Sequence, residues 1–201
     1  MNLEYFCQQV IEASRLPFAE RHKSLLGLHA RIVKEYVTAV KAISPELAAQ
    51  RAARGYEVRT LGQVVGHMAE WDRYSILAAG EILAGVRRPR MLSTLDGYLE
   101  PDGTRHAFND IEDFNQFQLK RQANWPWEQI RTSAIQSATV LYGLFADPVL
   151  MNAQRLEQTE PSYERLPNGT LIPDLAMGWC LWLIVIEHAG VEHAPELRME
   201  T

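Results

Sequence analysis

Residues 60–85 read TLGQVVGHMAEWDRYSILAAGEILAG, and this stretch is the clearest indicator of the fold class. Thr60 is a suitable N-cap, because its hydroxyl can accept a hydrogen bond from a free backbone N–H at the start of a helix. After it, apolar residues recur at helical spacing until Gly85 provides an ending. The apolar positions are Leu61, Val64, Val65, Met68, Trp71, Ile82 and Leu83. The stretch therefore predicts one long amphipathic helix.

Three other segments have the same helical periodicity. The first spans residues 20–43 and ends at Ser44-Pro45, because a residue before proline is disfavoured in the helical region. Another spans residues 110–145, with a break near Pro126, and the last runs from Pro173 to about His193. Residues 3–13 predict a short additional helix, and no strand alternation is evident. We therefore expect an all-α protein, an antiparallel four-helix bundle in which residues 1–201 form one domain.

Two long segments between these helices lack a regular period. They cover residues 86–109 and 147–173, and they contain turn signals such as Pro101-Asp102-Gly103 and Asn168-Gly169. Irregular connections of this length are uncommon in compact domains and are often functional. Residues 86–109 therefore either contribute to a functional site or form a structural cross-over that covers one end of the bundle.

The amino-acid composition is that of an ordinary globular protein. The chain has 201 residues, 47% of them hydrophobic, and a formal net charge of −5, which excludes a disordered chain and argues against nucleic acid as a partner. Cys7 and Cys180 lie among apolar residues and are expected to be reduced core thiols. The longest apolar run, residues 175–186, is too short to span a bilayer. Since residues 1–15 also lack a basic leader, we expect a cytoplasmic protein without a membrane anchor.

Three of the six histidines stand out by their context. His67 follows the apolar face of residues 60–85, while His188 and His193 lie at the end of the most apolar helix. Helix bundles commonly build metal sites from side chains that different helices direct inward, and imidazole is a common ligand for zinc-like ions. Each residue alone could instead be a hydrogen-bonded core histidine or a helix cap. The other three, His22, His29 and His106, are expected on the surface or in loops.

At these positions the chain resembles the DinB-like (DinB/YfiT) superfamily of four-helix-bundle proteins. Residues 60–71 are similar to the family's second-helix signature, in which a histidine precedes a tryptophan by one turn. Residues 80–85 resemble the ending of that helix, Phe114-Asn115 resembles the third-helix opening, and residues 187–198 resemble the fourth-helix ending with its paired histidines. The resemblance implies a divalent metal ion, zinc or nickel, held by His67, His188 and His193, and a low-molecular-weight thiol as a second cofactor.

The spacing of the two late histidines departs from that pattern. In the family they are normally four residues apart, whereas His188 and His193 are five apart, which separates them by about 140° around an ideal α-helix. A π-bulge near Gly190 would restore a common face. Alternatively, Glu192 replaces His193 as the third ligand, or the site has degenerated and binds no metal.

Residues near these motifs allow both structural and functional interpretations. Glu70 and Asp72 are expected to be solvated or to orient His67. The basic residues 87, 88 and 90 either meet an anionic ligand or form a solvated loop. The tryptophans are expected in the core or at a homodimer interface, namely Trp125, Trp127, Trp179 and Trp182.

Two hypotheses about function follow from the sequence. The first is a metal-dependent enzyme that acts on a small-molecule substrate; the family resemblance implies thiol transfer to an electrophile or hydrolysis, as in detoxification or a stress response. A bound ion would lower the pKa of a water molecule to about 7 or deliver a thiolate. The second is a non-catalytic bundle with a degenerate metal site, which binds small molecules or assembles as an oligomeric stress protein. The first hypothesis requires the side chains of His67, His188 and His193 to converge, whereas the second does not.

Overall fold

The computed structural model describes residues 1–52 and 59–197, which are mostly helical. The helices of this part of the chain are α1 (Leu3–Ser14), α2 (Phe18–Ala42), α3 (Pro45–Ala48), α4 (Leu61–Leu83), α5 (Ile111–Gln122), α6 (Trp127–Ala146), α7 (Ala153–Glu157) and α8 (Met177–Glu187). A 3-10 turn, η1 (Arg90–Leu92), precedes α5, and a π-helical turn, η2 (His188–Glu192), continues α8.

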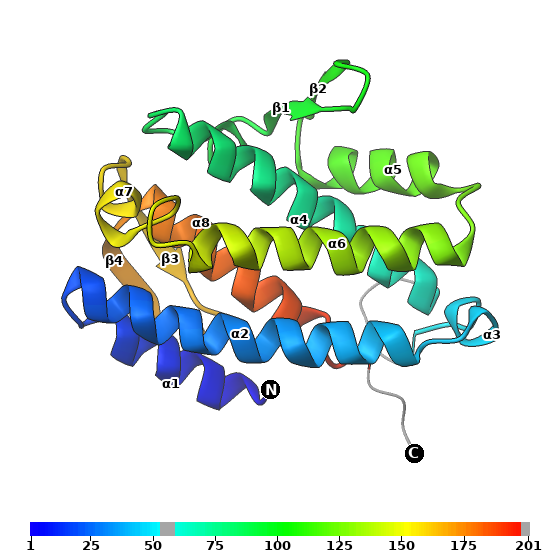
Figure 1. The fold of residues 1–201 in the computed structure, drawn as a ribbon, viewed down its shortest axis with the longest axis horizontal. Helices are drawn as coiled ribbons and strands as arrows, with labels where there is room; N and C mark the ends of the chain where they lie inside the picture. Colours follow the sequence, from blue (N-terminus) through cyan, green and yellow to red (C-terminus); the bar gives the residue numbers. More distant parts are fainter. Residues whose placement is uncertain (53–58, 198–201) are drawn as a thin grey trace.

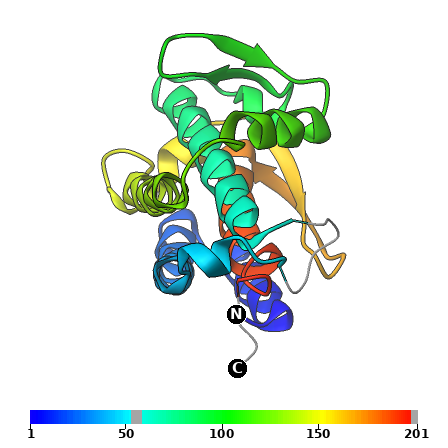
Figure 2. The ribbon, with the colours of Figure 1, turned by 90° about the vertical axis from the view of Figure 1, so that its right-hand side faces the viewer.

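The long helices lie roughly along the longest axis of the molecule (Figure 1). Helix α4 packs along α6, α2 packs against the other side of α6, and α8 contacts both α4 and α2. Figure 2 shows α4 near the centre of the end-on view, with α5 on one side of it and α1 and α2 on the other. None of the helices in the described part of the chain combines the length and apolar character needed to cross a membrane.

The start of α4 is fixed by a reciprocal cap. The Thr60 hydroxyl accepts a hydrogen bond from the backbone N–H of Gln63 at 3.2 Å, and the Gln63 side chain accepts one from the backbone N–H of Thr60 at 2.8 Å. This capping box satisfies two donors that a helix start leaves free. It confirms the predicted N-cap and sets the rotational position of α4, and hence the direction of His67 two turns later.

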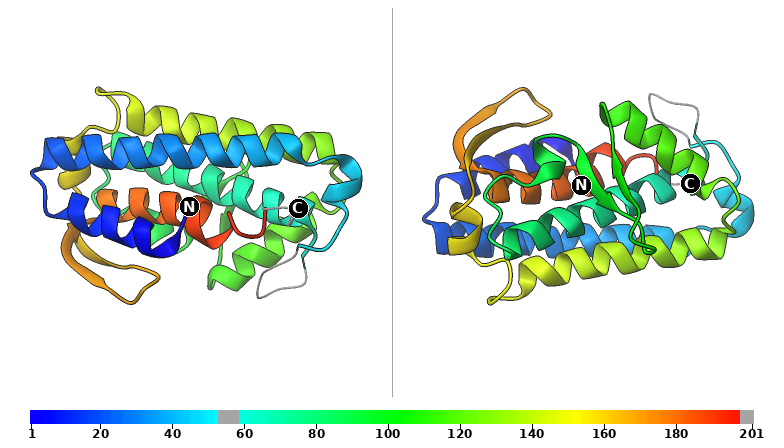
Figure 3. Two further views of the ribbon diagram at one scale, coloured as in Figure 1. Left: turned by 90° about the horizontal axis from the view of Figure 1, so that it is seen from below. Right: turned by 90° about the horizontal axis from the view of Figure 1, so that it is seen from above.

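The two irregular segments each contain a β-hairpin, which the sequence analysis missed. Strands β1 (Asp96–Leu99) and β2 (Arg105–Ala107) pair antiparallel, as do β3 (Pro161–Arg165) and β4 (Leu171–Ala176). The turn signals were real, but strands of three to six residues are too short to show a clear alternation. Pro173 consequently lies in β4, and the last α-helix begins at Met177 rather than at Pro173. The β3–β4 hairpin projects beside the α7 end of the molecule (Figure 3).

The core consists of two groups of buried side chains. The larger one includes Trp179, Trp182, Phe145 and Phe114 and fills the α7 half of the molecule. The smaller one joins the far ends of α2, α4 and α6 near α3. Ala189 of η2 packs against both groups, so the π turn lies where they meet. Cys7 and Cys180 are buried free thiols, as expected.

Candidate metal centre

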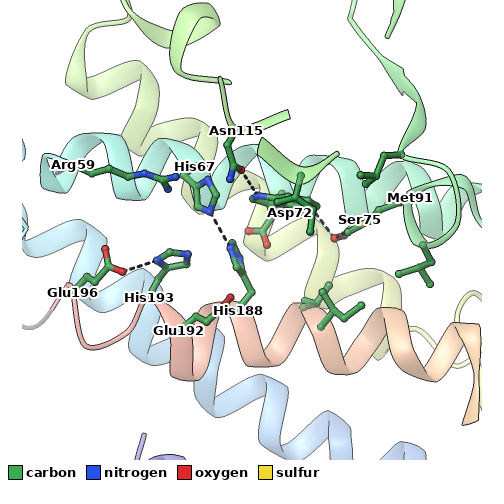
Figure 4. Close-up of a pocket in the computed structure, with 16 residues that line it drawn as sticks. Arg59, His67, Asp72, Ser75, Met91, Asn115, His188, Glu192, His193 and Glu196 are labelled. Carbon is green, nitrogen blue, oxygen red and sulfur yellow. Dashed lines mark hydrogen bonds and ion pairs between the residues drawn. The ribbon is translucent and has the colours of Figure 1, made fainter. Parts of the chain in front are cut away.

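Three histidines converge between α4 and the end of α8. One ring nitrogen from each of His67, His188 and His193 lies within 4.8 Å of the other two, and the Nε2 atoms of His67 and His188 are 3.2 Å apart. Figure 4 shows the three rings directed toward one another from the two facing segments. The three residues singled out in the sequence are therefore brought together, and at these distances they could hold one metal ion.

The five-residue spacing is accommodated by a π turn. The backbone N–H of His193 donates to the carbonyl of His188 at 3.2 Å, an i→i+5 hydrogen bond that brings the two residues onto one side of the helix. Gly190 permits close packing of this turn, because a Cβ atom there would lie 2.7 Å from Cδ1 of Ile32 on α2. The π-bulge alternative is thus confirmed. Glu192 lies in the wall of the adjoining cavity and is outside the cluster of three.

The outer nitrogens of two rings are held by acceptors. Nδ1 of His67 lies 3.0 Å from Oε1 of Gln118 on α5, and Nδ1 of His193 lies 3.0 Å from Oε1 of Glu196. Because an amide oxygen and a carboxylate accept hydrogen bonds, each Nδ1 carries the proton and each Nε2 presents a lone pair to the cluster. Neither partner was recognised in the sequence. Of the two, Glu196 could have been predicted as a partner of His193, because it follows that residue by three positions in the sequence.

Burial keeps two of the three rings, His67 and His188, neutral. Burial, then the nearby His193 and Arg59, lower the pKa of His67 to about 3. The pKa of His188 is likewise well below its ordinary value, chiefly because the ring is desolvated. Neutral imidazole is the form that ligates metals, and the three imidazole nitrogens beside the cavity could hold a metal ion with an open coordination position.

A cavity of about 540 Å³ adjoins the histidines. Polar and charged residues line it at the histidine end and partway along, whereas apolar side chains line the remainder (Figure 4). Met91, Leu92 and Leu95 of this apolar wall come from the irregular segment 86–109. Of the two interpretations of that segment, participation in the candidate site is the one that this geometry favours.

Glu70 and Asp72 of α4 are buried, so the first of the two alternatives given for them, a solvated position, is wrong. Glu70 accepts hydrogen bonds from Tyr98 and Arg121 and is 1% exposed, and Asp72 is 7% exposed and lines the cavity. The reason is that α4 is surrounded by α5, α6, α8 and the β1–β2 region and has no broad solvent face. Burial raises the pKa of Asp72 to about 7, and the hydrogen bond that its carboxyl accepts from the Ser137 hydroxyl at 3.4 Å offsets this only in part.

Three further predictions from the sequence concern His29, the basic residues of the loop after α4, and the tryptophans. His29 is not on the surface but 2% exposed in the core, where it accepts a hydrogen bond from Nε1 of Trp182 at 3.1 Å. Among the basic residues of the loop, Arg87 donates to the carbonyl of Gln158, and Arg90 pairs with Glu81, so both have structural partners away from the cavity. Of the tryptophans, Trp179 and Trp182 are fully buried, whereas Trp125 and Trp127 are partly exposed.

Comparisons of the chain with protein-family models, curated proteins and solved structures found no match. The geometry of the site is therefore the basis for any statement about function.

Proposed function

We propose that the chain is an antiparallel four-helix bundle of the DinB type and a metal-dependent enzyme, which transfers a thiol to a small electrophilic molecule or hydrolyses it. The observation that carries the proposal is the convergence of His67, His188 and His193 at one end of a cavity. The alternative, a non-catalytic bundle, was favoured by the irregular spacing of His188 and His193. Its main support is removed by the π turn, which gives these residues a common direction.

Each part of the site has a separate task in this proposal. A bound divalent ion supplies a Lewis acid and an activated oxygen or sulfur nucleophile at neutral pH. Gln118 and Glu196 orient two ligand rings, which keeps their Nε2 atoms directed at the ion. Arg59 lines the same end of the cavity, and its positive charge favours an anionic group there, such as a thiolate or the oxyanion that develops during acyl transfer.

The first test is elemental analysis of untagged protein and of two variants. We expect stoichiometric zinc or nickel in the parent protein and its loss in His67→Ala, because one ligand is removed. His106→Gln is the matched control, since His106 is a partly buried histidine on β2 that is outside the cluster. Absence of metal in the parent protein, even after zinc and nickel are offered, would overturn the proposal.

The second test separates the two reactions. Metal-loaded protein is incubated with an electrophile such as monobromobimane and a panel of low-molecular-weight thiols, and with activated esters in parallel. Thiol transfer predicts faster thiol conjugation with one of the thiols, and hydrolysis predicts ester cleavage that needs none. In either case His67→Ala should lose the rate enhancement, and His106→Gln should keep it.

A further inference from the structure

The cavity beside the histidines has a polar end and an apolar end. Arg59, Glu192 and Glu196 lie near the three histidines, whereas Met91 lies at the opposite end (Figure 4). The remaining wall comes from α4, α8, α5 and the irregular segment 86–109. Its apolar members are Trp71, Leu92, Leu95, Ile111, Ile184 and Val185. A ligand that reaches the histidines therefore has its other part against hydrocarbon.

The polar side chains along this wall are already engaged by the protein. The Ser75 hydroxyl donates to the carbonyl of Trp71 at 2.8 Å, and Asn115 Oδ1 accepts from Trp71 Nε1 at 3.3 Å. The Asp72 carboxyl accepts from Ser137 on α6. A polar substituent placed against Leu92, Leu95 and Ile184 would lose its hydration without gaining a hydrogen-bond partner from these side chains, which is unfavourable. The wall thus selects against polar groups.

One residue of the apolar wall, Leu95, has a strained backbone conformation. Leu95 has a φ of 50°, a left-handed conformation that costs a leucine free energy and that glycine would adopt readily. The conformation is held by hydrogen bonds from the Leu95 backbone N–H to Arg90 O and from the Phe108 backbone N–H to Leu95 O, each near 3 Å. Strained residues of this kind cluster at ligand-binding sites, and Leu95 lines the cavity.

We propose that the cavity binds a small molecule with a metal-ligating head group at the histidines and an alkyl or aryl body along Leu92, Leu95 and Ile184. This inference rests on the proposed function, and it defines its substrate class as a lipophilic electrophile rather than a sugar, nucleotide or polar amino-acid derivative. The cavity volume of about 540 Å³ is in the range that drug-sized ligands occupy.

The test uses n-alkyl hydroxamic acids of two to eight carbons, in which the head group chelates zinc and the length of the tail is the variable. Each is titrated calorimetrically into zinc-loaded protein. We expect the dissociation constant to fall about threefold for each added methylene until the chain fills the cavity, because each CH₂ leaves water for an apolar wall. A hydroxamate with a hydroxylated tail of the same length should bind at least tenfold more weakly than its alkyl counterpart.

Two variants test whether the apolar wall of the cavity causes the dependence of the dissociation constant on tail length. Leu95→Gly relieves the left-handed strain and removes the side chain, so the protein should fold while the dependence on tail length becomes shallower. Val149→Gly is the control, since Val149 is 71% exposed and is outside the cavity lining. A dissociation constant independent of tail length, with acetohydroxamic acid still bound, overturns this inference alone. If zinc-loaded protein does not bind acetohydroxamic acid at all, the open coordination position of the proposed function is refuted as well.

Discussion

His29 and His67 are both buried histidines whose pKa lies near 3, yet their surroundings differ in kind. His29 of α2 is packed against α6 and α8, where Trp182 donates to its Nδ1 and the rings of Tyr142 and Phe145 make T-shaped contacts with it. His67 has its Nδ1 toward Gln118 and its Nε2 toward two other imidazoles and a cavity. A depressed histidine pKa therefore does not identify a ligand. What distinguishes a candidate ligand is the group that the lone pair of its ring nitrogen faces.

The sharpest way to test this contrast is to truncate His29 and one of the three clustered histidines, His188, in metal-free protein. We expect His29→Ala to lower the free energy of unfolding by about 3 to 4 kcal/mol, because it leaves a cavity and an unpaired Trp182 N–H. We expect His188→Ala to cost less than half as much, because its ring borders an existing cavity. Urea denaturation measures both. Equal losses would contradict the distinction between a structural and a ligand histidine.

The carboxyl of Asp72 should make this region sensitive to pH. Its pKa is near 3.8 in the unfolded chain and about 7 in the folded protein, so the folded state binds more protons between these values. Stability should therefore fall as the pH rises from about 4 to 7 and stay low above it. Asp72→Asn removes this dependence, and its stability relative to the parent should rise across that interval by roughly 3 kcal/mol. Thermal unfolding of both metal-free proteins at pH 5 and pH 8 tests the sign.

Removal of the acceptor on His67 should weaken metal binding without removing a ligand. We expect Gln118→Leu to reduce zinc affinity by roughly 10- to 100-fold, because the ring loses the partner that fixes its tautomer and direction. Gln122→Leu is the matched control on α5, since Gln122 is also buried but donates to Gly66 O and Glu70 rather than to a histidine. Competition with a chromogenic chelator measures both affinities. A similar loss in the two variants would indicate a general effect of burial.

The smallest effect is expected at the π turn. Gly190→Ala places a Cβ atom 2.7 Å from Cδ1 of Ile32, so we expect a loss of about 1 kcal/mol of stability and weaker zinc binding. Ile32→Val removes that Cδ1 atom, and the double variant should recover most of both losses. A double-mutant cycle without coupling between the two positions would show that this contact is not what positions the turn.

The sequence predicted the helices well and the connections poorly. Periodicity located α2, α4 and the interrupted pair α5 and α6, because each has a continuous apolar stripe. The hairpins were missed because strands of three to six residues with exposed alternate positions carry little pattern. The three histidines were found from their context. Gln118 was not assigned to the site, and Asp72 was expected to be solvated or to orient His67, whereas it accepts a hydrogen bond from Ser137. These roles depend on the packing of α5 and α6 against α4, which a helical stripe does not specify.

The π turn also shows how a helix can absorb a change in chain length. One added residue in a regular α-helix rotates everything beyond it by about 100° and would turn a downstream ligand away from its partners. Here the extra residue is confined to residues 188–192, and His193 still faces His67 on another helix. A group of converging side chains can therefore survive a change of spacing within its own motif. Searches for such sites that demand one fixed spacing will overlook chains in which the geometry is intact.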